Sequence, residues 1–242
     1  MTSVSITPER RAAFGRKLRA WYRVHARDLP WRRTRDPYHI LVSELMLQQT
    51  QVSRVITKYA EFLHRFPTLE AVAGSRPARV REAWSGLGYY ARARNLQRLA
   101  RTIVREGAPA VIPREPEALR KLPGIGAYTA GAVASFAYER RAPLVDTNVA
   151  RVLTRVFAPH VNPRTHAGHR ETWQIARAVL PRTGPATYVH NQALMELGAL
   201  VCTARSRACP ACPVRSVCES FAAGHTPGRT PPVRPRKDRG VS

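Results

Sequence analysis

The chain has 242 residues, with 40 Lys and Arg against 16 Asp and Glu, so its formal net charge is +24. A chain of this length can bury a core in one or two compact domains, and its surplus of positive charge attracts polyanions such as nucleic acid. It has no apolar run of about 20 residues and no leader with a basic and then an apolar region. We therefore expect no membrane span or membrane partner, and a cytoplasmic location, associated with the nucleoid if the source is bacterial.

Apolar spacing and helix-start residues predict an all-α fold. Thr7-Pro8 and Asp36-Pro37 each place a capping side chain before a proline, which is typical of a helix N-terminus. No segment shows the strict alternation of a convincing strand. The expected helices cover residues 8–24, 37–47, 52–66, 91–105, 128–138, 147–157, 166–180 and 185–200.

Glu44 is the one acidic residue of the apolar helix expected over residues 37–47. Most helical glutamates lie on the surface, and that is one interpretation. The other is a partly desolvated carboxyl group whose raised pKa lets it hold a proton near neutral pH and act as a general acid.

A glycine-rich link, Leu122-Pro123-Gly124-Ile125-Gly126, joins helices expected over residues 115–121 and 128–138. Glycine lets another backbone come close, and the free N–H groups of a helix start can hold a phosphate oxygen. An ordinary helix connection with a glycine C-cap is the alternative interpretation.

Asp146 lies twenty residues after Gly126 and directly before the helix expected at Thr147. Its structural interpretation is an N-cap. The same position predicts a carboxylate that is exposed at a helix start, where the helix dipole keeps it ionised.

Two polar or glycine-rich breaks interrupt the first half of the chain. Gln48 and Gln49 form an amide pair that suits either a solvated loop or contacts with base edges. The run 86–90 (GLGYY) places Tyr90 beside glycines and arginines, which suits base stacking, although aromatic residues at helix joints more often belong to the core.

All four cysteines fall within one short stretch, which differs from a disulfide framework spread over a secreted chain. Zinc sites usually show two separated Cys-x2-Cys pairs, whereas one compact loop with four thiolates can hold an iron–sulfur cubane. The spacing therefore favours a [4Fe-4S] cluster. Its predicted ligands are Cys202, Cys209, Cys212 and Cys218.

Together these patterns resemble those of the helix-hairpin-helix (HhH-GPD) DNA glycosylases of the endonuclease III superfamily. The hairpin 122–126, Asp146 and the cysteine loop occur in the expected order, and the likeness covers roughly residues 10–220. The runs 43–52 and 86–96 are similar to those of the adenine glycosylase (MutY) branch. At Tyr128, endonuclease III has a lysine nucleophile, so we expect no Schiff base and a monofunctional enzyme.

The resemblance implies two helical lobes with a DNA-binding cleft between them. A six-helix barrel-like lobe would span residues 30–140, with the helix-hairpin-helix at 115–138. An iron–sulfur cluster lobe would combine residues 1–29 and 141–221. Composition predicts a disordered, basic Pro/Arg-rich tail over residues 222–242.

The resemblance also implies roles for individual residues. Glu44 would protonate a flipped adenine and Asp146 would stabilise the charge that develops on the sugar, as paired carboxylates do in glycoside hydrolysis. The iron–sulfur cluster would position the adjoining basic loop on DNA, with no redox step in base removal. The other implied assignments are Tyr128 and Asn148 around the sugar; Arg32 and Glu196 at the adenine edge; Gln48, Gln49 and Tyr90 around the opposite purine; and Leu122, Gly124, Ile125 and Gly126 at the DNA backbone.

The implied function is removal of adenine mispaired with guanine or 8-oxoguanine in double-stranded DNA, by a monomer. MutY proteins typically continue into a Nudix-like domain that helps recognise 8-oxoguanine, and we expect this chain to lack it. A G:T or G:U mismatch glycosylase is the alternative, because such short relatives have tyrosine at the Tyr128 position. A non-catalytic iron–sulfur DNA-binding module is a second alternative, against which the presence of both Glu44 and Asp146 argues.

Overall fold

The computed structural model describes residues 6–105 and 110–224, and over these residues the protein is built from helices. No strand occurs in this part of the chain, where Cys202 and Arg207 form an isolated β-bridge. The helices in chain order are α1 (Pro8–His25), η1 (Pro30–Arg32), α2 (Pro37–Leu47), α3 (Val52–Arg65), α4 (Leu69–Gly74), α5 (Pro77–Ala83), α6 (Ala91–Arg105), α7 (Pro116–Leu119), α8 (Ala127–Tyr138), α9 (Thr147–Phe157), α10 (His166–Ala178), α11 (Gly184–Leu200), η2 (Cys209–Ala211), η3 (Arg215–Val217) and α12 (Glu219–Ala222).

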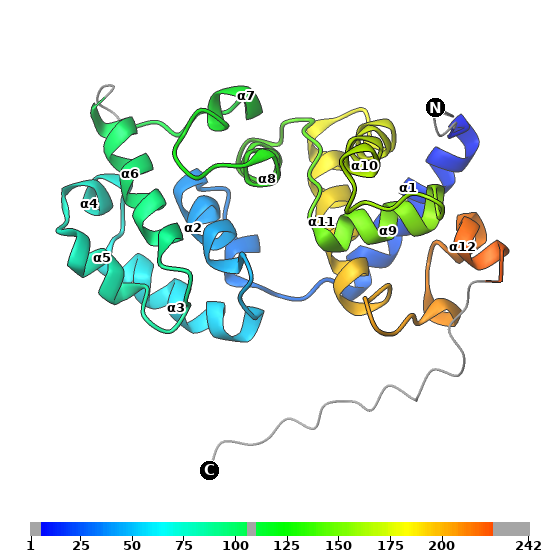
Figure 1. Cartoon of the computed structure of the whole chain (residues 1–242), viewed down its shortest axis with the longest axis horizontal. Helices are drawn as coiled ribbons and strands as arrows, with labels where there is room; N and C mark the ends of the chain where they lie inside the picture. Colours follow the sequence, from blue (N-terminus) through cyan, green and yellow to red (C-terminus); the bar gives the residue numbers. More distant parts are fainter. Residues whose placement is uncertain (1–5, 106–109, 225–242) are drawn as a thin grey trace, which may run out of the picture.

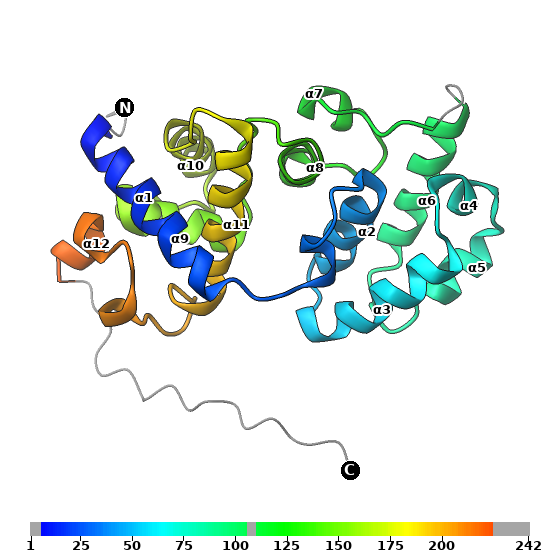
Figure 2. The same ribbon diagram turned by 180° about the vertical axis from the view of Figure 1, so that it is seen from behind.

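The helices form two groups that lie side by side (Figure 1). Helices α2 to α8 make one group, while α1 joins α9 to α12 in the other, and the view from behind shows the same division (Figure 2). The connections 26–36 and 139–146 pass between the groups. The predicted all-α architecture with two helical lobes is confirmed.

Short capping residues begin the helices as the sequence predicts. The Thr7 side chain accepts a hydrogen bond from Arg10 N at 3.3 Å, and Asp36 Oδ1 accepts one from His39 N at 2.9 Å. Each cap satisfies one of the N–H groups that a helix start leaves without an intrahelical partner.

The helix expected over residues 115–121 is shorter in the structure. It ends at Leu119, and the chain continues in turns in which Lys121 N donates to Ala118 O at 3.1 Å and Leu122 N to Leu119 O at 3.0 Å. Pro123 explains the early end, because a proline disfavours helical geometry in the residue before it.

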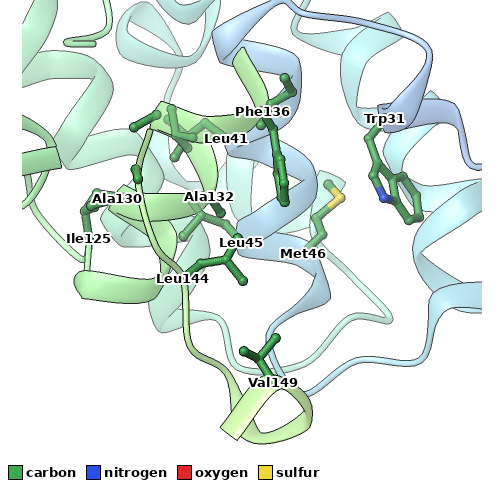
Figure 3. Packing of buried hydrophobic residues seen from close by; sticks show 14 of the residues in the cluster. Trp31, Leu41, Leu45, Met46, Ile125, Ala130, Ala132, Phe136, Leu144 and Val149 are labelled. Carbon is green, nitrogen blue, oxygen red and sulfur yellow. The ribbon is translucent and has the colours of Figure 1, made fainter. Parts of the chain in front are cut away.

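Helix α2 is the centre of the first lobe and is buried on nearly every side. It packs against α8 and α3. Figure 3 shows Leu41 and Leu45 of α2 beside Ala132 and Phe136 of α8. Small residues on α8 let the two helices come close, so a side chain on α2 has little solvent around it.

No helix in residues 6–105 and 110–224 has the length and apolar character needed to cross a lipid bilayer. Of the tail predicted to be disordered over residues 222–242, the stretch 225–242 lies outside the described residues.

Candidate active site

A cleft holds most of the predicted site residues. It encloses about 1800 Å³, counted out to open solvent. The start of α8, the connection before α9 and the middle of α11 meet there with the end of α2. The cleft is lined by predicted residues from all of these elements, namely Glu44, Gln48, Gln49, Gly126, Tyr128, Asp146, Asn148, Arg32 and Glu196.

Glu44 is buried in the cleft wall, with 3% of its surface exposed. Its Oε2 atom is buried and has no hydrogen-bond partner among the described residues. Burial raises the pKa of Glu44 from 4.5 to about 7; the Tyr128 hydroxyl opposes this rise, the Asp146 carboxylate adds to it, and Arg32 opposes it. The desolvated general acid is therefore the interpretation that the structure supports, and the surface glutamate is wrong.

Asp146 is the N-cap of α9, and its carboxylate is also part of the cleft. Oδ1 accepts a hydrogen bond from Val149 N at 2.7 Å, and Oδ2 accepts one from Asn148 Nδ2 at 3.2 Å. Burial raises the pKa of Asp146, while these two donors favour the ionised form. The prediction of an exposed carboxylate was wrong, because neighbouring elements partly bury it at the helix start.

Tyr128 stands in the first turn of α8, between the two carboxyl groups. Burial raises its pKa well above 10, and the charges of Glu44 and Asp146 raise it further, so the hydroxyl keeps its proton. That hydroxyl also lies 3.9 Å from Met195 Sδ. Tyr128 can therefore donate a hydrogen bond to a carboxylate or to a bound molecule, but it cannot supply an amine nucleophile.

Glu196 of α11 is fully buried and is held by two arginines. Arg27 Nε lies 2.6 Å from Oε1, and Arg32 Nη2 lies 2.7 Å from Oε2. Burial alone would raise the pKa of Glu196, but the two ion pairs outweigh it and the pKa is lowered. Arg32 Nε also donates to Gln192 Oε1 at 2.9 Å, so the predicted pair Arg32 and Glu196 forms one rigid network on a wall of the cleft.

A second arginine, Arg151, joins the catalytic aspartate's neighbour to the cysteine region. Its Nη2 donates to Asn148 Oδ1 at 2.8 Å, and the same nitrogen donates to Gly198 O at 2.7 Å. Its Nε donates to Cys202 O at 2.8 Å. These bonds fix the Asn148 amide so that its Nδ2 atom points to Asp146.

The two loops that carry Gln48, Gln49 and Tyr90 are held together by Arg92. The Arg92 guanidinium is buried and donates to backbone oxygens at the end of α2, including Leu45 O at 2.9 Å, and to Gly88 O at 3.0 Å. Gln49 has a φ of 55°, a left-handed conformation that costs energy for a residue with a side chain. The surrounding loop holds this strained backbone in place.

Tyr90 is not part of the cleft wall. It lines a separate hollow, and the Arg81 guanidinium lies 5.2 Å from its ring centroid. Its neighbour Tyr89 is 61% exposed and has a φ of 45°. The structure therefore places the predicted stacking aromatic on the surface next to the cleft.

The predicted backbone-binding hairpin forms a turn between α7 and α8. Ile125 N donates to Leu122 O at 3.2 Å, and the side chains of both residues are buried, so they anchor the turn from inside. Gly124 has a φ of 78°, and a Cβ atom there would lie 2.6 Å from Asn95 Cβ. Gly126 supplies no side-chain cap to α8, so the first N–H groups of the helix stay available to an anion.

The four cysteines line a single cavity in the second lobe. No three His, Cys, Asp or Glu side chains in the described residues are close enough to hold one metal ion. The donor set fits a larger group with one sulfur ligand at each corner, as an iron–sulfur cubane requires.

Two observations support that fit. Arg155 Nη1 lies 3.3 Å from Cys202 Sγ, so a guanidinium already stands beside a sulfur that would carry negative charge. Burial raises the pKa of the Cys212 thiol to about 11. A thiolate at Cys212 therefore needs positive charge close by, which bound iron would supply.

Sequence reasoning missed three residues of this site: Arg27, Arg151 and Gln192. The arginines carry no local signal, because an arginine-rich chain offers many equivalent candidates. Gln192 lies one turn before Glu196 on α11, on the same helix face, and that spacing could have indicated it.

Comparison with known proteins gives consistent relatives. Residues 42–178 match the model of the HhH-GPD superfamily base excision DNA repair protein. The adenine DNA glycosylase of Mycolicibacterium smegmatis is 47% identical over 213 residues, which cover 88% of this chain and 71% of that protein. The adenine DNA glycosylase of Rattus norvegicus is 43% identical over 217 residues, which cover 86% of this chain and 42% of the rat protein. The chain thus spans less than half the length of its rat relative.

Among solved structures, a thermostable thymine-DNA glycosylase superposes with a TM-score of 0.81 at 29% sequence identity. The match covers 89% of this chain and 98% of that one. The likeness therefore includes both lobes and the cleft between them.

Proposed function

The chain belongs to the HhH-GPD superfamily of base excision DNA repair proteins, and we propose that it is a monofunctional glycosylase that removes adenine mispaired with guanine or 8-oxoguanine in double-stranded DNA. The observation that carries the proposal is the buried Glu44, whose pKa of about 7 leaves it partly protonated at neutral pH, in one cleft with Asp146. The adenine DNA glycosylases with 37 to 47% identity support the choice of base.

The reaction is hydrolysis of the bond between the base and the sugar. Glu44 donates its proton to a ring nitrogen of the flipped adenine, so the base leaves as a neutral molecule. Positive charge then develops on the sugar, and the Asp146 carboxylate stabilises it. A water molecule adds to the sugar carbon and returns a proton to Glu44, which completes the cycle.

The arginine network around Glu196 explains how the base would be recognised. A carboxylate with a lowered pKa stays ionised and accepts hydrogen bonds, as from an exocyclic amino group. Arg32, with only 10% of its side chain exposed, offers N–H donors to a base nitrogen on the same wall. Because both groups are fixed before a base arrives, little conformational entropy is lost on binding.

The cysteine cavity would hold a [4Fe-4S] cluster through Cys202, Cys209, Cys212 and Cys218. The cluster would supply structural order to the loop between α11 and α12, and we assign it no part in base removal. Purified protein should contain about four irons per chain and absorb broadly in the visible range. One zinc per chain would contradict this assignment.

A thymine or uracil mismatch glycosylase is the second candidate, because the solved structure with a TM-score of 0.81 is a thymine-DNA glycosylase. The chemistry of the two carboxyl groups does not separate the candidates. The Glu196 network does favour adenine, since it presents an ionised acceptor to the exocyclic amino group that adenine has and thymine lacks.

The deciding test is single-turnover base release from duplexes that carry A opposite 8-oxoguanine, A opposite G, T opposite G, or U opposite G. We expect adenine release, with strand cleavage appearing only after alkali, because Tyr128 replaces the lysine that a lyase needs. Release of thymine or uracil without adenine would establish the second candidate. A protein with its cluster intact that binds each duplex and releases no base would be a non-catalytic module.

A further inference from the structure

A row of arginines lies along one side of α1, far from the catalytic residues. Arg16, Arg19 and Arg23 follow each other at helical spacing, and Arg11 stands two turns before Arg19. None of these four residues forms an ion pair within residues 6–105 and 110–224. We refer to Arg11, Arg16, Arg19 and Arg23 as the α1 arginine row.

The row ends in a second cavity, on the side of α1 that meets the start of α11. Arg11 and Arg19 line it together with Arg141 and Arg182, and Thr183 precedes α11 at its edge. The cavity holds about 1320 Å³ out to open solvent, and no acidic side chain lines it. We call it the arginine pocket.

Arg19 is the clearest sign that this pocket lacks a counter-ion. Burial lowers its pKa, and the charges of Arg23 and Arg16 lower it further. Its guanidinium lies over Gly15, where a Cβ atom would be 2.7 Å from Nη1. A half-buried cation surrounded by like charges gains energy from any oxyanion that enters.

The arginine pocket and the catalytic cleft share no lining residue. They lie at opposite ends of α1 and α11, since Arg19 is eight residues before Arg27 and Thr183 is thirteen before Glu196. At 1.5 Å per residue these separations are roughly 12 and 20 Å. Figure 2 shows α1 along the outer side of its lobe, next to α11.

We infer that the α1 arginine row and the arginine pocket form a second binding surface for the phosphate backbone of DNA, able to hold a duplex segment other than the one in the cleft. The row extends over more than three helical turns, roughly 18 Å, which suits a chain of phosphates better than a single small anion. Planar guanidinium groups bind phosphate oxygens in pairs. The inference rests on the proposed function only in taking DNA as the polyanion.

An anionic membrane fits this surface less well. A helix that lies in a membrane surface needs a free apolar face, whereas the apolar residues of α1, such as Phe14 and Leu18, are fully buried against the rest of the lobe. A second DNA surface would let the protein touch a new segment before it leaves the old one, which speeds transfer along and between duplexes.

The test replaces Arg11, Arg19 and Arg182 by glutamine together. The matched control replaces Arg76, Arg79 and Arg98, three exposed arginines of the other lobe. Each protein is first saturated with a short mismatched duplex that carries a non-cleavable adenine analogue, and a labelled undamaged duplex is then titrated in at several salt concentrations. Thermal unfolding of both variants, and an Arg19→Lys variant that keeps the charge, separate loss of binding from loss of folding.

We expect the wild-type protein and the control to bind the second duplex, and the pocket variant to bind it weakly. Each lost phosphate contact lowers the slope of log K against log salt by about 0.9, so three contacts make wild-type binding fall about 40-fold more than variant binding between 50 and 200 mM salt. An equal slope in the variant would overturn the inference. Binding of a polyglutamate peptide or anionic vesicles in preference to the duplex would overturn it as well.

Base release from the short duplex is measured in parallel and should stay unchanged in the pocket variant, because none of its three residues lines the cleft. If no protein releases adenine but the second duplex still binds through the pocket, the proposed function fails and the second surface stands. If adenine release is normal and no second duplex binds, only the second surface fails.

Discussion

Replacing Glu44 by glutamine should abolish base release and at the same time make the protein more stable, by an amount that grows with pH. The carboxyl group is buried, Oε2 has no partner, and its pKa is raised from 4.5 to about 7. A raised pKa means that the folded state disfavours the ionised form. The free energy of unfolding is therefore highest while Glu44 is protonated and falls as pH rises from about 4.5 to about 7.

The size of this effect follows from the two pKa values. Their difference, from 4.5 to about 7, corresponds to about 3.4 kcal/mol once the group is fully ionised. At pH 5 the loss is about 1 kcal/mol, and at pH 7 it is about 3 kcal/mol. Glutamine does not titrate, so the stability of the Glu44→Gln protein relative to wild type should rise by about 2 kcal/mol between these two pH values.

Urea denaturation of both proteins at pH 5, 7 and 8.5 measures this difference, provided that the slope with urea is equal in the two. Glu70→Gln, at an exposed glutamate in the first turn of α4, is the matched control and should show no such trend. The same Glu44→Gln protein should lose about 100-fold or more in single-turnover base release. A stability difference that stays constant with pH would refute the buried carboxyl group with a raised pKa.

Three further outcomes follow from the structure. Base release should fall as pH rises through about 7, and Tyr128→Phe should move that fall to higher pH, because its hydroxyl holds the pKa of Glu44 down; a pH profile that stays in place would contradict this. Arg92→Met should lower the free energy of unfolding by about 3 kcal/mol, measured in urea, since it leaves buried carbonyls unpaired, while the exposed Arg94→Met should change it little. His190→Leu should stabilise the protein, because neither ring nitrogen has a partner among the described residues. Burial lowers the pKa of His190 from 6.5 to about 3, so wild type should lose stability as pH falls through that range and the leucine variant should lose less.

Local signals in the sequence predicted the helices well where a cap and a periodic apolar pattern coincide. The helix from residue 37 to 47 agrees at both ends, because Asp36 and Pro37 fix its start and the amide pair at Gln48 and Gln49 follows its end. The short helix α7 was overestimated, since its end depends on Pro123 and on a turn with few distinguishing residues.

The catalytic carboxyl groups were predictable for a different reason from that of the residues around them. Glu44 is a charged residue in an apolar helix, and Asp146 follows the hairpin at a fixed spacing, so both are visible in the chain itself. Arg27 reaches Glu196 across 169 residues, and Arg92 reaches Leu45 across 47. Contacts of this kind depend on tertiary packing, which single-sequence patterns do not contain.

Three carboxyl groups share one cleft, yet each has a different surrounding and therefore a different chemical use. Glu44 has an unpaired oxygen in an apolar wall and keeps a proton near neutral pH. Glu196 is held by two guanidinium groups, so it stays ionised and serves as a hydrogen-bond acceptor. Asp146 caps α9 and receives hydrogen bonds from Val149 and Asn148, which favour its negative charge without neutralising it. Proton donor, base acceptor and charge stabiliser thus follow from burial, ion pairing and helix capping, and exchanging any two of these surroundings would remove the reaction.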